Sequence, residues 1–134
     1  QRFADNINII TLNYGLSDIS GKFKLTDSVD GSSFLNLKGK DTVICEVRNI
    51  FDVLKDLKIN NIDLMKVNIE GGEYPLLQHI ADKNSLDIVN FYQIQFHNFI
   101  EEAEKKRQKI LIALNRSHTN TWCYKFVWES WERK

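Results

Sequence analysis

The residues best suited to chemistry lie where two apolar runs of the sequence end. The first run, residues 62–69, leads directly into Glu70, Gly71, Gly72 and Glu73. A carboxylate at the end of a strand can accept a proton, and glycines let the backbone approach a ligand closely. The alternative is structural, because acidic residues also stabilise the start of a helix through its dipole. The pattern by itself leaves both interpretations open.

His97 is the second candidate, at the end of a run that begins at Val89. Gln93, Gln95 and His97 share one face of the expected strand. A single histidine is more often a structural residue than a catalyst, although imidazole readily exchanges a proton near neutral pH. We expect His97 to lie at the same sheet edge as Glu70, because the C-terminal ends of parallel strands meet at one edge. This placement favours a functional role.

A metal site and a phosphate-binding loop have little support. Carboxylate and imidazole groups suit a divalent cation, and the polar residues after the two runs are Glu70, Glu73, His97 and Asn98. Their spacing matches no metal-ligand motif, so we expect no metal. The six glycines form neither a G-x-G-x-x-G pattern nor a P-loop, which is the main objection to a cofactor-dependent enzyme.

Composition excludes several further classes of protein. Eighteen basic and eighteen acidic residues cancel, so we expect neither a nucleic-acid partner nor an anionic membrane. No apolar stretch approaches the ~18 residues of a membrane span. No secretory signal is visible, and the expected location is the cytoplasm. Cys45 and Cys123 are too few for a disulfide framework and are expected to be reduced core thiols.

The elements that must position these residues alternate between strand and helix. Apolar, β-branched runs predict strands at 7–14, 23–29, 42–47, 62–69, 89–97 and 121–131. Helical periodicity predicts helices at 50–57, 73–82 and 99–117. Asn49 is expected to cap the first helix, residues 27–41 to form an exposed loop, and residues 62–69 to form a central strand covered on both faces. This order is typical of a single α/β domain.

The segment 62–74, Ile-Asp-Leu-Met-Lys-Val-Asn-Ile-Glu-Gly-Gly-Glu-Tyr, resembles the D-L-L-K-[IM]-[DN]-I-E-G-x-E signature of FkbM-type methyltransferases. Further segments that resemble the family lie in the expected order along the chain, 12–21 and 47–54 before this signature and 93–99 and 126–131 after it. The resemblance covers nearly the whole chain. It implies a Rossmann-like class I methyltransferase that transfers a methyl group from S-adenosylmethionine, typically to a hydroxyl oxygen of a sugar or glycan or of another small acceptor.

The resemblance also implies that residues 1–134 correspond to the C-terminal portion of one methyltransferase domain. The family's first strand, its Gly-rich loop and the acidic residue that holds the ribose would precede Gln1 and have no counterpart in the sequence. We therefore expect a Rossmann-like sheet that lacks its first strands, and a chain that is inactive by itself. An open sheet edge and an uncovered apolar face also predict self-association.

Residue by residue, the resemblance implies five cofactor-binding positions: Leu16, Ser17, Asp18, Asn68 and Gly71. The first three would lie near the adenine and the other two beside the methyl-transfer centre. Asn68 stands where the family often has Asp, and an amide cannot act as a base. Glu70 is therefore the expected catalytic residue, with His97 second. The alternative is a non-catalytic remnant or binding module that keeps the sheet without a working cofactor site, and a sugar-binding domain is a third possibility.

Overall fold

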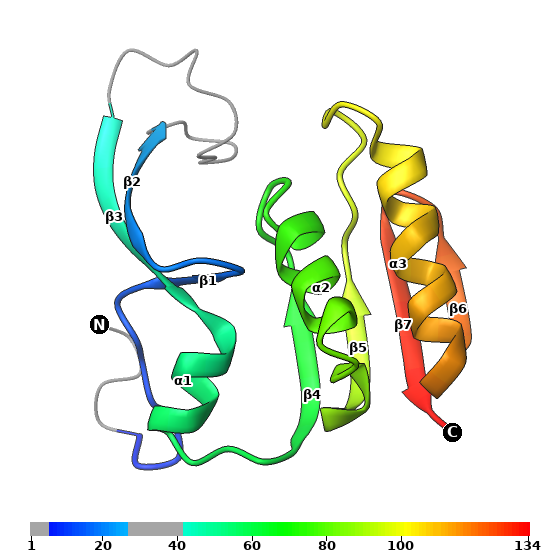
Figure 1. Ribbon diagram of the computed structural model, residues 1–134, viewed down its shortest axis with the longest axis horizontal. Coiled ribbons are helices and arrows are strands. Elements are labelled where there is room, and N and C mark those ends of the chain that lie inside the picture. Colours follow the sequence, from blue (N-terminus) through cyan, green and yellow to red (C-terminus); the bar gives the residue numbers. More distant parts are fainter. Residues whose placement is uncertain (1–5, 27–41) are drawn as a thin grey trace.

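The computed structural model describes residues 6–26 and 42–134, which form two β-sheets and three α-helices (Figure 1). The smaller sheet has the order β1-β3-β2, with β1 at Gly15–Ser17, β2 at Gly21–Thr26 and β3 at Thr42–Asn49. The larger sheet has the order β4-β5-β7-β6, with β4 at Ile62–Val67, β5 at Val89–Ile94, β6 at His118–Tyr124 and β7 at Trp128–Arg133. The helices are α1 (Ile50–Asp56), α2 (Glu73–Asp82) and α3 (Ala103–Ser117), with a 3₁₀ turn at Leu86–Ile88 before β5. The prediction of a mixed α/β chain is confirmed.

The directions of the strands in the larger sheet determine which strand ends lie at the same edge. β4 and β5 are parallel, β7 is antiparallel to β5, and β6 is antiparallel to β7. The C-terminal ends of β4, β5 and β6 therefore lie at one edge, together with the start of β7. Glu70 follows β4 and His97 follows β5 at this edge, as the sequence predicts.

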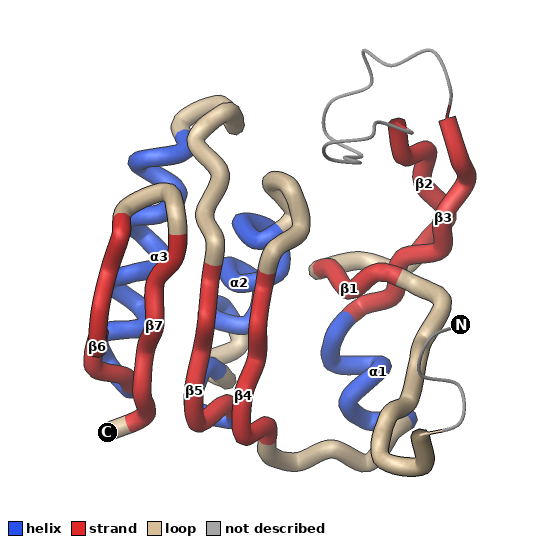
Figure 2. The backbone as a smooth tube through the Cα atoms, turned by 180° about the vertical axis from the view of Figure 1, so that it is seen from behind, coloured by secondary structure: helices blue, strands red, loops and turns tan. Residues whose placement is uncertain are grey.

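One face of the larger sheet carries both helices that follow its parallel strands. In Figure 2, α2 and α3 lie behind the strands, and the core forms between these layers from Leu77, Ile80, Ile110, Leu114, Val67, Tyr92, Ile94 and Trp131. The opposite face leaves Leu64 52% exposed. The prediction that residues 62–69 form a central strand covered on both faces is wrong for the described residues, because β4 lies at the edge of its sheet. Self-association through this edge remains a prediction.

Several predicted elements are confirmed, with small changes at their ends. Asn49 caps α1, since its side chain accepts a hydrogen bond from the Phe51 amide at 2.9 Å. The last helix begins at Ala103 rather than at residue 99, because the preceding residues form turns and Glu102 is left-handed, with φ 54°. The predicted strand 121–131 is instead a hairpin of β6 and β7, whose turn contains Phe126 at φ 58°.

The first predicted strand is absent. Residues 7–14 form turns and irregular backbone, and Ile7 and Ile10 are 96% and 77% exposed. Apolar, β-branched composition makes a strand only where a neighbouring strand accepts its hydrogen bonds, and here pairing starts at Gly15 opposite Val47. The predicted loop 27–41 lies outside the described residues.

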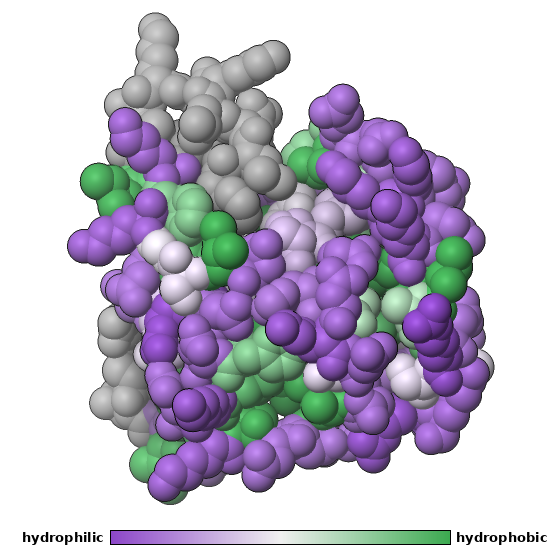
Figure 3. All heavy atoms as spheres, viewed as in Figure 1, coloured by the Kyte–Doolittle hydropathy of each residue, from purple (hydrophilic) through white to green (hydrophobic). Residues whose placement is uncertain are grey.

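Two other expectations concern surface properties. Cys45 is half-buried and Cys123 is exposed, so the prediction of two core thiols is wrong. Both occur in strands, where alternate side chains point away from the core. Among the described residues, no helix is both long enough and apolar enough to cross a membrane. Figure 3 shows a mainly hydrophilic surface on the side of the molecule that carries α2 and α3.

Candidate functional site

The turn between β4 and α2 depends on glycine. Glu70 and Gly71 both have left-handed backbone conformations, with φ 49° and 100°, which bend the chain sharply out of the strand. At Gly72, a Cβ atom would lie 3.2 Å from the Ile69 carbonyl oxygen and equally close to the Ile69 side chain. The Gly-Gly pair therefore lets the chain leave β4 and enter α2 directly, and it places Glu70 and Glu73 beside the strand end.

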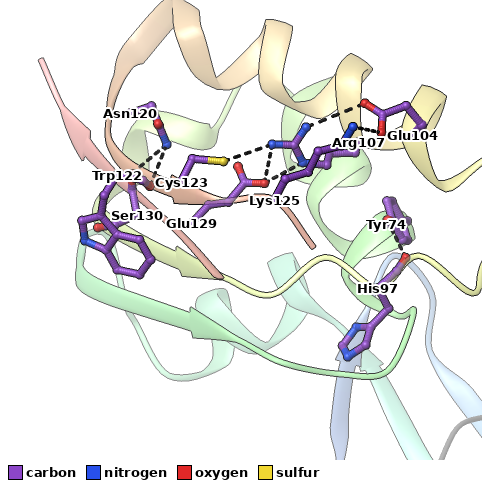
Figure 4. Close-up of polar contacts among 10 residues, drawn as sticks. All are labelled: Tyr74, His97, Glu104, Arg107, Asn120, Trp122, Cys123, Lys125, Glu129 and Ser130. Carbon is purple, nitrogen blue, oxygen red and sulfur yellow. Dashed lines mark hydrogen bonds and ion pairs between the residues drawn. The ribbon is translucent and has the colours of Figure 1, made fainter. Parts of the chain in front are cut away.

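His97 reaches the same place from β5. The Gln95 amide donates to the Val67 carbonyl at 2.9 Å, so the two strands remain paired beyond the end of β5. Phe96 is buried in the core, and His97 is buried at the sheet edge. The Tyr74 hydroxyl of α2 donates a 2.8 Å hydrogen bond to the His97 carbonyl, which ties the end of β5 to α2 (Figure 4). Burial raises the pKa of Tyr74, with the neighbouring Glu73 carboxylate adding to the effect, so this donor keeps its proton.

The His97 ring lies between two carboxylates. Its Nε2 atom is 3.4 Å from Glu70 Oε1, and its Nδ1 atom is 3.0 Å from Glu73 Oε1. The same Glu73 oxygen accepts a 2.9 Å hydrogen bond from the His97 amide, and Glu73 Oε2 accepts one of 2.8 Å from the Gly71 amide. Glu73 is fully buried, whereas Glu70 is only partly so. The structure thus brings together Glu70 and His97, the two predicted catalytic residues.

The sequence pattern offers Glu73 as a residue that stabilises a helix start or, with less support, as a metal ligand, and does not predict its contact with His97. Its full burial and its contacts with His97, 24 positions along the chain, show a larger role. The E-G-x-E spacing was the available signal, but it does not reveal that the second carboxylate turns inward.

A buried ion pair lies next to the site and packs against the end of β5. Arg107 of α3 places Nε and Nη2 each 2.6 Å from Glu129 Oε1, and the two side chains are 7% and 1% exposed (Figure 4). The Arg107 guanidinium lies 5.9 Å from the centre of the Phe96 ring, next to His97, and 5.8 Å from that of Phe126 in the hairpin turn. This pair links α3, the end of β5 and the hairpin of β6 and β7. Sequence reasoning missed it, although Arg107 lies in the same helical stripe as Ala103, Ile110 and Leu114.

The five predicted cofactor residues fall into two groups. Leu16, Ser17 and Asp18 end β1: Leu16 is partly exposed, and the buried Ser17 hydroxyl donates to Asp18 at 2.8 Å. The Asn49 side chain contacts both the Asp18 carbonyl at 2.5 Å and His79 Nε2 on α2 at 3.2 Å.

The second group lies at the other end of α2. Asn68 is exposed and Gly71 is buried in the turn that precedes this helix. Asn49 therefore connects the first group to His79, which lies six residues beyond Glu73, so the two groups lie toward opposite ends of α2.

Two other features bear on ligand binding. Among the described residues, no cluster of three or more His, Cys, Asp or Glu side chains is arranged to hold a metal ion. A groove of about 840 Å³ lies between α2 and α3, with Gly71, Tyr74, Phe99, Ile100 and Lys106 among the residues that line it. Glu70 and His97 are not among the lining residues, but Gly71, the residue after Glu70, borders the groove.

Comparison with known proteins gives one family. Residues 4–120 match the family described as "Methyltransferase FkbM domain". No curated protein and no solved structure matches the chain. The family match includes the β4–α2 turn and the end of β5, where Glu70, Glu73 and His97 meet.

Proposed function

Because the chain belongs to the FkbM methyltransferase domain family, we propose that, as part of such a domain, it takes part in the transfer of a methyl group from S-adenosylmethionine to a hydroxyl oxygen of a sugar or another small acceptor. The observation that carries the proposal is the position of the His97 ring between Glu70 and Glu73, at the edge where β4 and β5 end. Two parallel strands followed by an antiparallel neighbour support a Rossmann-like class I sheet. Ligands bind such sheets at the C-terminal ends of their strands.

The chemical types of the predicted cofactor residues suit an extended nucleoside with an amino-acid tail. The partly exposed Asp18 carboxylate can accept a hydrogen bond from the amino group of an adenine ring, and the buried Ser17 hydroxyl donates to that carboxylate and orients it. The exposed Asn68 amide can donate and accept, and Gly71 offers backbone without a side chain. When bound, S-adenosylmethionine supplies a methyl carbon activated by a sulfonium leaving group. The residues would hold it along α2, with the reactive end near Glu70.

The protein's own contribution is alignment and proton removal. Holding the acceptor oxygen in line with the methyl carbon is a proximity effect. The acceptor hydroxyl must lose one proton as its oxygen is methylated, and the unit of Glu70 and His97 would accept that proton. A positioned base typically contributes a rate factor of ~10²–10⁴.

The first test is calorimetric titration of the chain with S-adenosylhomocysteine. Micromolar binding would support a cofactor site in this chain. Absence of binding would mean that residues 1–134 by themselves do not form a working cofactor site.

Once binding is established, Glu70→Gln tests the role of the carboxylate. We expect turnover with a hydroxyl acceptor to fall ~10²-fold or more, while the affinity for S-adenosylhomocysteine stays within about twofold. Glu132→Gln, at an exposed carboxylate of β7, is the matched control and should change neither value. Unchanged turnover of Glu70→Gln would refute the assignment of Glu70 as the base.

A further inference from the structure

We propose that Glu73 is a positioning residue for this reaction: its buried carboxylate holds the His97 ring with a proton on Nδ1 and with Nε2 turned toward Glu70. The catalytic consequence rests on the proposed methyl transfer. The position of the proton on the His97 ring follows from the contacts alone, so it can be tested separately from the catalytic role.

Both oxygens of Glu73 face hydrogen-bond donors. Its two oxygens face three nitrogen atoms: the amides of His97 and Gly71, and His97 Nδ1, at 2.8–3.0 Å. Both amides are obligate donors, and an ionised carboxylate can only accept. The 3.0 Å contact between Glu73 Oε1 and His97 Nδ1 is therefore attractive only when Nδ1 carries a proton.

A helix-start role alone does not account for this arrangement. A carboxylate in the first turn of a helix stabilises it while remaining exposed to solvent. Glu73 is instead fully buried and contacts both the backbone and the ring of His97 at the end of another strand. Burying a carboxylate is costly unless it is hydrogen-bonded, and these contacts offset that cost.

Only glutamate satisfies this geometry. Glutamine has one acceptor oxygen, and whichever way its amide points, an NH₂ group faces at least one of the donors. Aspartate is one methylene shorter and would not span from α2 to His97 with the same backbone. The chain thus needs both carboxylate oxygens at this position.

The consequence appears on the other side of the ring. With a proton on Nδ1, Nε2 points its lone pair at Glu70 Oε1, 3.4 Å away. A proton taken up from a bound acceptor can therefore bind between these two atoms. Glu70 and His97 form one proton-accepting unit, and the 3.0 Å contact of Nδ1 with Glu73 favours this orientation of the ring.

The ring state can be measured directly by two-bond ¹H–¹⁵N correlation NMR of the histidine-labelled wild-type chain. His118 provides an internal reference of the opposite kind, because its Nε2 lies 2.9 Å from the Val89 carbonyl and must donate to it. We expect an Nδ1–H pattern for His97 and an Nε2–H pattern for His118, with each assigned by its His→Gln variant. An Nε2–H pattern for His97 in the wild-type chain would overturn the proposal, and this result requires no destabilised variant.

Glu73→Gln tests the positioning role, with Tyr74→Phe as the matched control. We expect Glu73→Gln to mix the two ring forms of His97 and to lower kcat by ~10–100-fold with little change in KM. Tyr74→Phe removes a hydrogen bond to the same residue's carbonyl and should leave the ring form unchanged. A pure Nδ1–H pattern with wild-type kcat in Glu73→Gln would overturn the positioning role. Failure of the methyl-transfer function would appear instead as no S-adenosylhomocysteine binding with the Nδ1–H pattern intact.

Discussion

Removing the charge of Glu129 should destabilise the protein strongly. In Glu129→Gln the side chain keeps its shape, but the guanidinium of Arg107 loses the carboxylate that both Nε and Nη2 contact at 2.6 Å. Because Arg107 is only 7% exposed, water cannot replace that partner. The variant therefore leaves a buried positive charge without its main counter-charge.

The magnitude follows from the surroundings of Arg107. Breaking a buried ion pair by removing one partner costs ~3–5 kcal/mol. Two features favour the lower end of this range: Glu104 lies 3.9 Å from the guanidinium, and the rings of Phe96 and Phe126 flank it. We therefore expect a loss of about 3 kcal/mol in the free energy of unfolding. For a chain of 134 residues this corresponds to a fall of ~10 °C in Tm.

The assay is urea unfolding followed by tryptophan fluorescence and circular dichroism. The surface pair between Lys105 and Glu102 is the matched control, since both side chains are more than half exposed, and Lys105→Gln should leave stability unchanged within the error of the measurement. Replacing both buried partners, with Arg107→Met and Glu129→Leu, should recover stability to within ~1 kcal/mol of wild type. A loss below ~1 kcal/mol in Glu129→Gln would refute the reasoning, because it would mean that water reaches the guanidinium.

Three further perturbations test other parts of the fold. Burial lowers the pKa of His118 from 6.5, so the unfolded chain binds a proton at this residue more readily than the folded chain does. The free energy of unfolding should therefore fall as the pH drops below about 6.5, by at most ~1.4 kcal/mol per pH unit. In urea unfolding between pH 7 and 5, His118→Gln should flatten this slope. Asn49→Ala removes both the cap of α1 and the hydrogen bond to the Asp18 carbonyl, and it should lower the free energy of unfolding by ~1–2 kcal/mol in chemical unfolding. Asn49→Asp keeps an oxygen that can cap α1 and should therefore lose less stability. Equal losses in the two variants would contradict a role of the cap in stability. Leu77→Ala empties a fully buried position of α2 and should cost ~2–5 kcal/mol in the same assay, and a loss below ~1 kcal/mol would show that α2 is not packed as described.

Much of the candidate site could be predicted from local sequence. The apolar run before Glu70, the glycine pair and the following helix are all local signals, and each corresponds to an observed element. The cap at Asn49 is local in the same sense. Parallel strands bring their C-terminal ends to one edge, so the proximity of Glu70 and His97 also follows from the predicted order of elements.

The sequence by itself determined the family, the alternation of helices and strands, and the pairing of Glu70 with His97, because these depend on motif spacing and on local burial and turn preferences. Only the tertiary structure decided that residues 7–14 form no strand, that Glu73 turns inward to His97 and that Arg107 is buried against Glu129. Each of these outcomes depends on a partner distant in the chain. A strand needs a neighbour to accept its hydrogen bonds, and a buried charge needs a counter-charge, and no local pattern shows whether packing will supply either one.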